Sequence, residues 1–487
     1  MSSNIKKNLG LQSAYQILNT VLPLITAPYL ARVLGASMLG VFSYTTSIVA
    51  YFALFAMLGT VNYGTRTIAE CKDDRAKTET AFWGIYIFQL IMTLITIGLY
   101  VIYLIFFCKD NIAISIIQLI TLIACGFDIN WLFFGMEHFS ITVTRSIVIK
   151  IVTVLLIILL VKQPEDLWIY TVIMLGGTLF SQLVLWVYLP RYVSFVRVKW
   201  KNIVEHIKPN FILFIPLLAM SVYHTMDKTM LGVISSYEQC GFYYNADKVI
   251  NIPICVLNGV GTVMLPRMTS LFNSNKRKEA DNLFVISLEG IAVVSCAMAF
   301  GIAAVSKEFV PVFFGKGYDN CVLLTIILAP VLIIKGFSNA ARTQYLVPLK
   351  MEIVFTKSVF AGAITNLVFN LLLIPKLGAL GAVIGTLLAE LVSCTWQFIY
   401  MSKTISLKKC FLNSTAYVLF GVIMFVVIRI VSIFSYPILV KLLFEICLGA
   451  VIYIVACLVF WKLTNSNMYR IVFGDFIMKI PILRKIL

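Results

Sequence analysis

Apolar runs of membrane-spanning length recur along nearly all of this 487-residue sequence, and no other feature constrains its fold as strongly. A helix needs about 20 mostly apolar residues to cross a bilayer. Hydrophobic residues make up 60% of the chain and charged residues only 13%, whereas a soluble domain has about 25% charged residues. The sequence therefore predicts an all-α polytopic membrane protein with about fourteen transmembrane helices and short connections. The predicted spans are 10–32, 37–60, 81–107, 112–135, 146–161, 167–190, 209–232, 242–265, 283–306, 321–341, 353–375, 379–402, 412–433 and 439–461.

Lysines and arginines are distributed unevenly between the two sets of alternating connecting segments. The set that includes the N-terminal segment holds 27 of these residues, and the opposite set holds 7. Cytoplasmic loops of membrane proteins are enriched in lysine and arginine, so this bias predicts that both termini are cytoplasmic. The net charge of +17 is explained in the same way and does not indicate a nucleic-acid partner.

Cysteine and histidine usage gives no indication of a metal or disulfide framework. The 11 cysteines stand singly and mostly within apolar runs, where a thiol behaves as a small hydrophobic group. His138, His206 and His224 are not spaced as metal ligands. The chain has no GxSxG motif, no phosphate-binding loop and no carboxylate pair on an aqueous domain. We therefore predict a protein that is not an enzyme and that uses no cofactor or metal.

Two hairpins with similar sequences suggest an internal duplication. Leu34-Gly35 and the segment 40–44 (GVFSY) close the first hairpin, and Leu231-Gly232 and the segment 241–244 (GFYY) close the hairpin of spans seven and eight. Repeated halves around a central site are a common plan in transporters, although two glycine-bounded hairpins also arise by chance. The predicted division is an N-terminal lobe of six helices (1–207), a second six-helix lobe (208–402), and two extra helices with a basic cytoplasmic tail (403–487).

The second of these hairpins carries two Asp-Lys dipeptides at membrane depth, Asp227-Lys228 and Asp247-Lys248. Neighbouring residues on a helix point about 100° apart, so cross-pairing of Asp227 with Lys248, or of Lys228 with Asp247, is the geometrically reasonable arrangement. One interpretation is that these pairs only hold the hairpin together. The other is that they line a water-filled cavity in which a lysine meets an anionic substrate, because charges inside a bilayer mark substrate pathways.

Three further charged residues are candidates for function. Arg32 either extends to the outer interface or faces the cavity. Arg66 either follows the inside bias of basic residues or lies at the cytoplasmic mouth. Asp128 is either a carboxylate coupled to protons or cations or a hydrogen-bonded packing group. Other charged residues within or beside the spans are isolated in sequence and cannot be oriented, namely Glu289, Lys335, Lys357, Glu390 and Arg429.

At these positions the chain resembles the polysaccharide-repeat-unit flippases (Wzx-type) of the multidrug/oligosaccharidyl-lipid/polysaccharide exporter superfamily, and the resemblance extends over nearly the whole sequence. The order and spacing of several short motifs carry it together. These motifs are RVLG at 32–35 with GVFS at 40–43, NYGTR at 62–66, Asp227-Lys228 with Leu231-Gly232, GFYYNADKV at 241–249, and Pro266-Arg267.

The resemblance implies two six-helix lobes around a central cavity and alternating access in a bacterial inner membrane. It implies a partner that is an oligosaccharide on a polyprenyl pyrophosphate, bound by the cations Arg32, Lys228 and Lys248, with polymerase and glycosyltransferases of the same pathway nearby. We expect a monomer. The energy source stays open between protons, sodium ions and no coupling. Two alternatives remain: a cation-coupled drug exporter or other lipid-substrate exporter of the same superfamily, and a membrane-embedded polymerase or glycosyltransferase.

Overall fold

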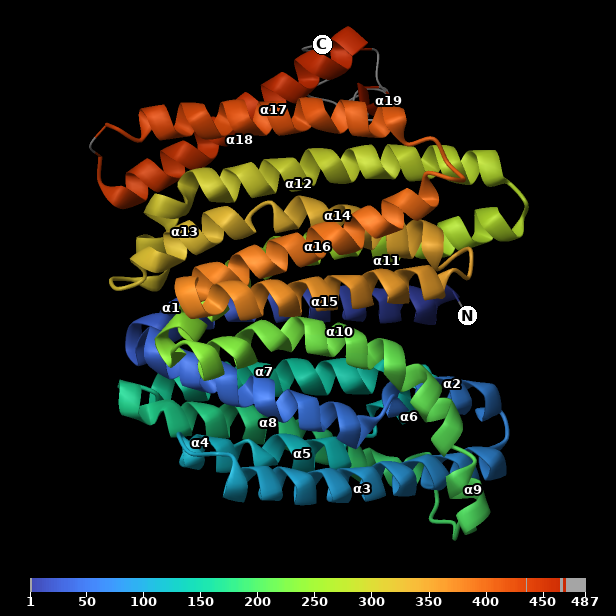
Figure 1. Ribbon diagram of the computed structural model, residues 1–487. Helices are drawn as coiled ribbons and strands as arrows, with labels where there is room; N and C mark the ends of the chain where they lie inside the picture. Colours follow the sequence, from blue (N-terminus) through green and yellow to red (C-terminus); the bar gives the residue numbers. More distant parts are fainter. Residues whose placement is uncertain (1, 435, 465–466, 470–487) are drawn as a thin grey trace. The chain divides into compact units, whose positions relative to one another are not determined.

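The computed structural model describes residues 2–434, 436–464 and 467–469, and all regular secondary structure in these residues is helical (Figure 1). Among them, 12 helical stretches are long and apolar enough to cross a membrane. The first stretch, Leu22–Cys71, covers two predicted spans, and α10 (Ile207–Ile234) coincides with the predicted seventh span. The all-helical, many-span architecture is therefore confirmed, with fourteen as an approximate count. The side chain of His224 and the basic residues Arg470, Lys479, Arg484 and Lys485 lie outside the described part.

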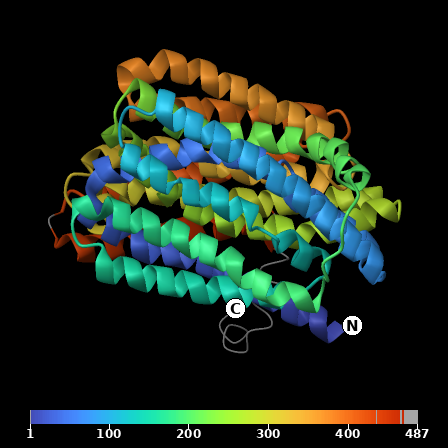
Figure 2. The ribbon, with the colours of Figure 1, turned by 90° about the horizontal axis from the view of Figure 1, so that it is seen from below.

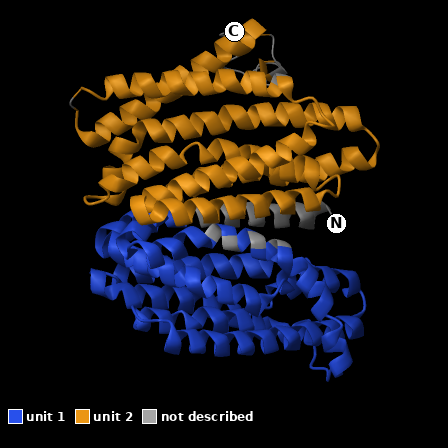
Figure 3. Ribbon diagram, in the orientation of Figure 1, with its two compact units in different colours: residues 1–244 blue, residues 245–487 orange. Residues whose placement is uncertain are grey.

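Backbone contacts divide the chain into two compact units, residues 1–244 and 245–487 (Figure 3). The predicted lobe boundary at residue 207 stays a prediction. Unit 1 contains α1 (Ser2–Met57), α2 (Thr60–Cys71), α3 (Arg75–Phe106), α4 (Ile112–Ile117), α5 (Leu119–Gly126), α6 (Asn130–Gly135), α7 (Phe139–Leu160), η1 (Pro164–Asp166), α8 (Leu167–Tyr188), η2 (Leu189–Arg191), α9 (Trp200–Val204), α10 and the start of α11 (Tyr237–Asn273).

Unit 2 begins inside α11 and is built around the long helix α12 (Arg277–Phe314), which packs against α17 (Lys408–Val431) and α18 (Ile438–Thr464). Two neighbouring helices, α15 (Glu352–Leu377) and α16 (Ala379–Met401), form a second tightly packed pair. The remaining described elements are α13 (Asp319–Leu328), α14 (Val331–Ala340), η3 (Ala341–Leu346) and α19 (Asn467–Tyr469).

Glycines with positive φ mark the two places where the first spans break. Gly35, inside α1, has φ 73° and ψ 172°, which interrupts the helix between the predicted spans 10–32 and 37–60. Gly59, with φ 81°, separates α1 from α2, and a Cβ there would lie 2.9 Å from the carbonyl oxygen of Asn210. Left-handed backbone and a close approach both favour glycine, which has no side chain. These two residues therefore set how the first helices bend.

Each unit has its own aromatic core. In unit 1, the fully buried rings of Phe82, Trp131 and Phe133 join α3 to α6. In unit 2, Phe284 and Tyr417 join α12 to α17. Many large apolar side chains are instead exposed, such as Phe106 at 72% and Leu463 at 81%. Exposed apolar area on this scale is what lipid covers in a membrane protein.

Candidate functional site

A break in a membrane helix places the first candidate, Asp128, between α5 and α6. The Asp128 Oδ1 accepts hydrogen bonds from the backbone N of Asn130 at 2.9 Å and from Asn130 Nδ2 at 2.7 Å. Asn130 Nδ2 also donates to Gln182 Oε1 on α8, at 2.9 Å. Arg145 on α7 donates from Nη2 to Asn130 Oδ1 at 3.0 Å and from Nη1 to the carbonyl of Ser181 at 2.5 Å. An acid and a base are thus linked through Asn130.

The backbone carbonyls freed by this break are held by one glutamine. Gln89 on α3 donates from Nε2 to the carbonyls of Cys125 and Asp128, at 2.7 and 2.9 Å. Its Oε1 accepts from Trp131 Nε1 at 3.0 Å, so all of its polar atoms are used. Irregular backbone at membrane depth is tolerated only where such partners replace water. No sequence pattern indicated that Gln89, Gln182 and Arg145 are partners of Asp128, because these residues come from three other helices.

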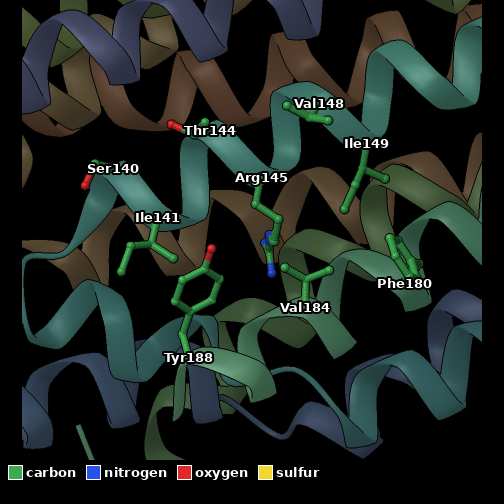
Figure 4. A pocket seen from close by; sticks show the side chains of 9 residues that line it. All are labelled: Ser140, Ile141, Thr144, Arg145, Val148, Ile149, Phe180, Val184 and Tyr188. Atoms are coloured by element: carbon green, nitrogen blue, oxygen red, sulfur yellow. The ribbon is translucent and has the colours of Figure 1, made fainter. Parts of the chain in front are cut away.

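A cavity of about 460 Å³ adjoins this network between α7 and α8, which lie side by side (Figures 1 and 2). Figure 4 shows Arg145 of α7 directed toward α8 and Tyr188 of α8 directed toward α7. The Arg191 guanidinium lies 5.6 Å from the ring of Tyr188. A cation and hydroxyls beside an apolar wall suit an anionic or hydroxyl-rich group that carries an alkyl chain. The lining residues are Ser140, Ile141, Thr144, Arg145, Val148, Ile149, Phe180, Val184 and Tyr188.

The Asp227-Lys228 dipeptide lies near the end of α10, within unit 1. Asp227 is buried, and its Oδ2 accepts a hydrogen bond from the Tyr243 hydroxyl at 2.5 Å. The ammonium group of Lys228 lies 5.7 Å from the centroid of the Tyr244 ring, within reach of a cation–π interaction. Both aromatic partners belong to the first turns of α11, so each charge of the dipeptide contacts the returning helix of its own hairpin.

Asp247 and Lys248 belong to unit 2. The backbone carbonyl and the Oδ1 of Asp247 accept from Asn251 Nδ2 at 2.9 and 2.8 Å. Lys248 is half-buried and makes interactions of its own. The predicted cross-pairing with Asp227 and Lys228 joins the two units, and it stays a prediction.

The two hairpins that looked like repeats in the sequence pack against each other within unit 1. A Cβ at Gly40 would fall onto the carbonyl group of Tyr237, and a Cβ at Gly241 would fall onto the carbonyl group of Ala36. A Cβ at Gly232 would likewise overlap the ring of Tyr44. The glycines of both motifs therefore let α1 and the start of α11 touch backbone to backbone.

Arg32 and Arg66 both lie on exposed helix faces. Arg32 is exposed on α1 and has interactions of its own. Arg66 on α2 pairs one turn along with Glu70, Nε to Oε1 at 2.9 Å, and its side chain is 76% exposed. Nearby, Lys72 pairs with Glu137 at 2.7 Å. This ion pair raises the pKa of Lys72 and lowers the pKa of the Glu137 carboxyl.

His206, which precedes α10, is a polar contact that the sequence did not point to. Its Nδ1 lies 2.8 Å from the hydroxyl oxygen of Tyr63 on α2. The ring also fills the space beside Gly84, where a Cβ would lie 2.8 Å from Nε2. Burial lowers the pKa of His206. The His206 ring is thus held between α2 and α3.

Four of the isolated charges of unit 2 have partners that lie far away in sequence. Lys335 Nζ lies 3.2 Å from Glu390 Oε1, and Arg429 Nη2 lies 2.7 Å from Glu308 Oε2. Glu289 Oε1 accepts from the hydroxyl of Tyr417 at 2.7 Å. In the sequence, these residues stand out only because they are charged and lie inside apolar spans. That position does not indicate which residues they pair with.

Residues 5–272 match a family model described as "Polysaccharide biosynthesis protein". A protein of Escherichia coli (strain K12) called "Putative O-antigen transporter" is 24% identical over 391 residues, which are 80% of this chain and 94% of that protein. The "Probable low-salt glycan biosynthesis flippase Agl15" of Haloferax volcanii is 23% identical over 186 residues, which are 38% of this chain and 39% of that protein. Transporter and flippase names agree with the prediction of a protein that is not an enzyme.

Two solved structures share the fold. The inward closed conformation of "Lipid II flippase MurJ" superimposes with a TM-score of 0.74 at 14% identity, covering 93% of this chain and 99% of that one. An inward-facing multidrug resistance transporter of the MATE family matches with a TM-score of 0.59 at 13% identity, covering 81% of this chain and 98% of that one. The second structure is described as a transporter of the MOP superfamily. The predicted fold, which is that of such transporters, is therefore confirmed.

Proposed function

We propose that this chain, which belongs to the family of polysaccharide biosynthesis proteins, is a flippase for a polyprenyl-pyrophosphate-linked oligosaccharide. The family match over residues 5–272 is the observation that carries this proposal. The similarity to a putative O-antigen transporter over 80% of the chain supports it. The fold shared with a lipid II flippase is consistent with a lipid-linked substrate.

The proposed transport step moves the repeat unit from the inner to the outer leaflet by alternating access. The pyrophosphate binds to Arg32, Lys228 and Lys248 while the polyprenyl chain stays in lipid. A charge within a membrane-spanning helix is costly, up to about 2.5–3.5 kcal/mol at the helix centre on insertion scales, so cations are retained at membrane depth when an anionic group offsets that cost. The contact of Lys228 with the Tyr244 ring supports this role, because an aromatic face holds an ammonium group without neutralising it.

The proposed setting is the bacterial cytoplasmic membrane, with both termini on the cytoplasmic side. The product is then a capsule, O-antigen or exopolysaccharide, made with the polymerase and glycosyltransferases of the same pathway. The lobes 1–207 and 208–402 would rock against each other, with Arg66 at the cytoplasmic mouth and Asp128, Asp227 and Asp247 as supporting acids. The transporting form is a monomer.

The test is lipid analysis of the producing bacterium after deletion of this gene. Loss of surface polysaccharide, with complete lipid-linked repeat units accumulating in the cytoplasmic leaflet, is the expected result. Accumulation of incomplete units assigns the chain to assembly of the repeat unit instead. Unchanged polysaccharide with increased drug sensitivity assigns it to drug export.

The binding residues are tested by complementing the deletion with variants. We expect the triple variant Arg32→Gln, Lys228→Gln, Lys248→Gln to be expressed in the membrane and to restore less than a tenth of the polysaccharide. Lys77→Gln serves as the matched control, because Lys77 is 76% exposed and pairs only locally with Asp74. Full activity of the triple variant would refute the proposed binding residues.

A further inference from the structure

A cluster of four charged residues lies inside unit 2, where α12, α17 and α18 meet. Glu308 on α12 binds two cations, Arg429 Nη2 at 2.7 Å and Lys441 Nζ at 3.1 Å, one on each carboxylate oxygen. Glu445 lies one turn beyond Lys441 on α18 and is fully buried. We refer to Glu308, Arg429, Lys441 and Glu445 as the Glu445 cluster. It is separate from the residues assigned to substrate binding above.

Glu445 is the member of the cluster that takes no part in the two ion pairs of Glu308. Both of its carboxylate oxygens are buried and lack a hydrogen-bond partner among the described residues. A buried ionised carboxylate without donors is strongly disfavoured, so a group in this position either carries a proton or finds a cation. Burial therefore favours the protonated form.

Of the neighbouring charges, the Glu308 carboxylate acts in the same direction as burial, whereas the cations Arg429 and Lys441 act in the opposite direction. The charged groups that act on Glu445 are Glu308 from α12, Arg429 from α17 and Lys441 from α18 itself. With Glu445 protonated, the cluster has two cations and one anion. With Glu445 ionised, the charges balance. Burial and charge balance thus oppose each other at this one carboxyl group.

The cluster also contains an unused donor for the ionised form. Arg429 Nε is buried and makes no hydrogen bond within the part of the chain that is described. An unmet N–H donor and an unmet carboxylate therefore belong to the same four residues. Pairing them satisfies both groups, since a guanidinium fork accommodates two carboxylates at different edges.

We propose that the Glu445 cluster is a proton-binding site, in which the Glu445 carboxyl group gains and loses a proton. On release, the O–H bond of the Glu445 carboxyl breaks, the proton passes to water, and the carboxylate pairs with Arg429 Nε. Arg429 and Lys441 repel metal cations, so the ligand is a proton and not sodium. The side chains of Arg429 and Lys441 are 24% and 19% exposed, so the cluster extends to the surface of unit 2. This site does not depend on the proposed substrate.

The experiment is infrared difference spectroscopy of the purified full-length protein in lipid nanodiscs, titrated across neutral pH. The wild type is expected to lose a carboxylic-acid C=O band as the pH rises, and Glu445→Gln is expected to lack that band. The matched control is Glu390→Gln, since Glu390 is also buried in unit 2 but pairs with Lys335 at 3.2 Å. The control should keep the band.

A second variant covers the case in which Glu445→Gln does not fold. Arg429→Lys keeps the positive charge and removes the Nε donor, so it should raise the midpoint of the band by about one pH unit or more, a tenfold tighter hold on the proton. Three outcomes would overturn the proposal: no titrating band in the wild type, an unchanged band in folded Glu445→Gln, or an unmoved midpoint in Arg429→Lys.

Discussion

The hydroxyl group of Tyr243 donates to the buried carboxylate of Asp227 at 2.5 Å, which ties the start of α11 to the end of α10. A hydrogen bond to a charged group contributes about 1.5–3 kcal/mol, more than one between neutral groups. The bond therefore holds the hairpin that also presents Lys228.

Removing that donor should loosen the hairpin. We expect Tyr243→Phe to lower the stability of the protein by about 2 kcal/mol, because a buried carboxylate loses a donor. Asp227→Asn keeps an acceptor for Tyr243 and should cost less stability. Thermal unfolding of both variants in the same detergent is the measurement. A larger loss in Asp227→Asn than in Tyr243→Phe would contradict this reading.

The glycine contact between α1 and α11 should not tolerate even a methyl group. Gly40→Ala and Gly241→Ala each place a Cβ onto a backbone carbonyl, which cannot move aside as a side chain can. We expect each variant to lose at least about 1–3 kcal/mol of stability and most of its polysaccharide-restoring activity. Gly98→Ala in α3 is the control, because no atom lies within 4 Å of a Cβ there. Equal stability and equal polysaccharide-restoring activity of all three variants would contradict the tight contact between α1 and α11.

The break at Asp128 gives a prediction that separates its two interpretations. Asp128→Ala removes the acceptor for both donors of Asn130 and should destabilise the protein by about 1–3 kcal/mol. Asp128→Asn keeps an acceptor oxygen and should stay folded. Transport by the asparagine variant then decides the role: retained activity indicates a packing group, and lost activity in a folded protein indicates a coupled carboxylate.

His206 should make stability fall in acid. Burial lowers its pKa in the folded protein below the ordinary value of about 6.5, so the unfolded chain binds the proton more tightly. This contribution is constant above about pH 6.5 and is lost as the pH falls toward the lowered pKa. We expect the unfolding temperature to drop between pH 7 and pH 5 by less in His206→Asn than in the wild type. An equal drop would assign the pH dependence to other groups.

The sequence predicted where the helices lie better than it predicted which helices and side chains contact one another. Apolar run length alone located the spans, since crossing a bilayer imposes a length on every helix. Gly35 and Gly232 belong to a repeated sequence motif, but nothing in that motif indicates that the two hairpins touch. Glu308 and Arg429 lie on helices far apart in sequence, and their pairing depends on packing that no local pattern encodes. Gln89 was missed for the same reason, because its role is to hold carbonyls of another helix.

The contact of Gly40 and Gly241 with opposing backbone has a mechanical consequence. Most helix pairs interlock through side chains, so rotation of one against the other needs several rotamers to change together. Here main chain meets main chain at two points, and the rings of Tyr44 and Tyr237 lie 5.5 Å apart beside them. Because a main-chain carbonyl group cannot move aside as a side chain can, this contact sets a fixed spacing between the two helices.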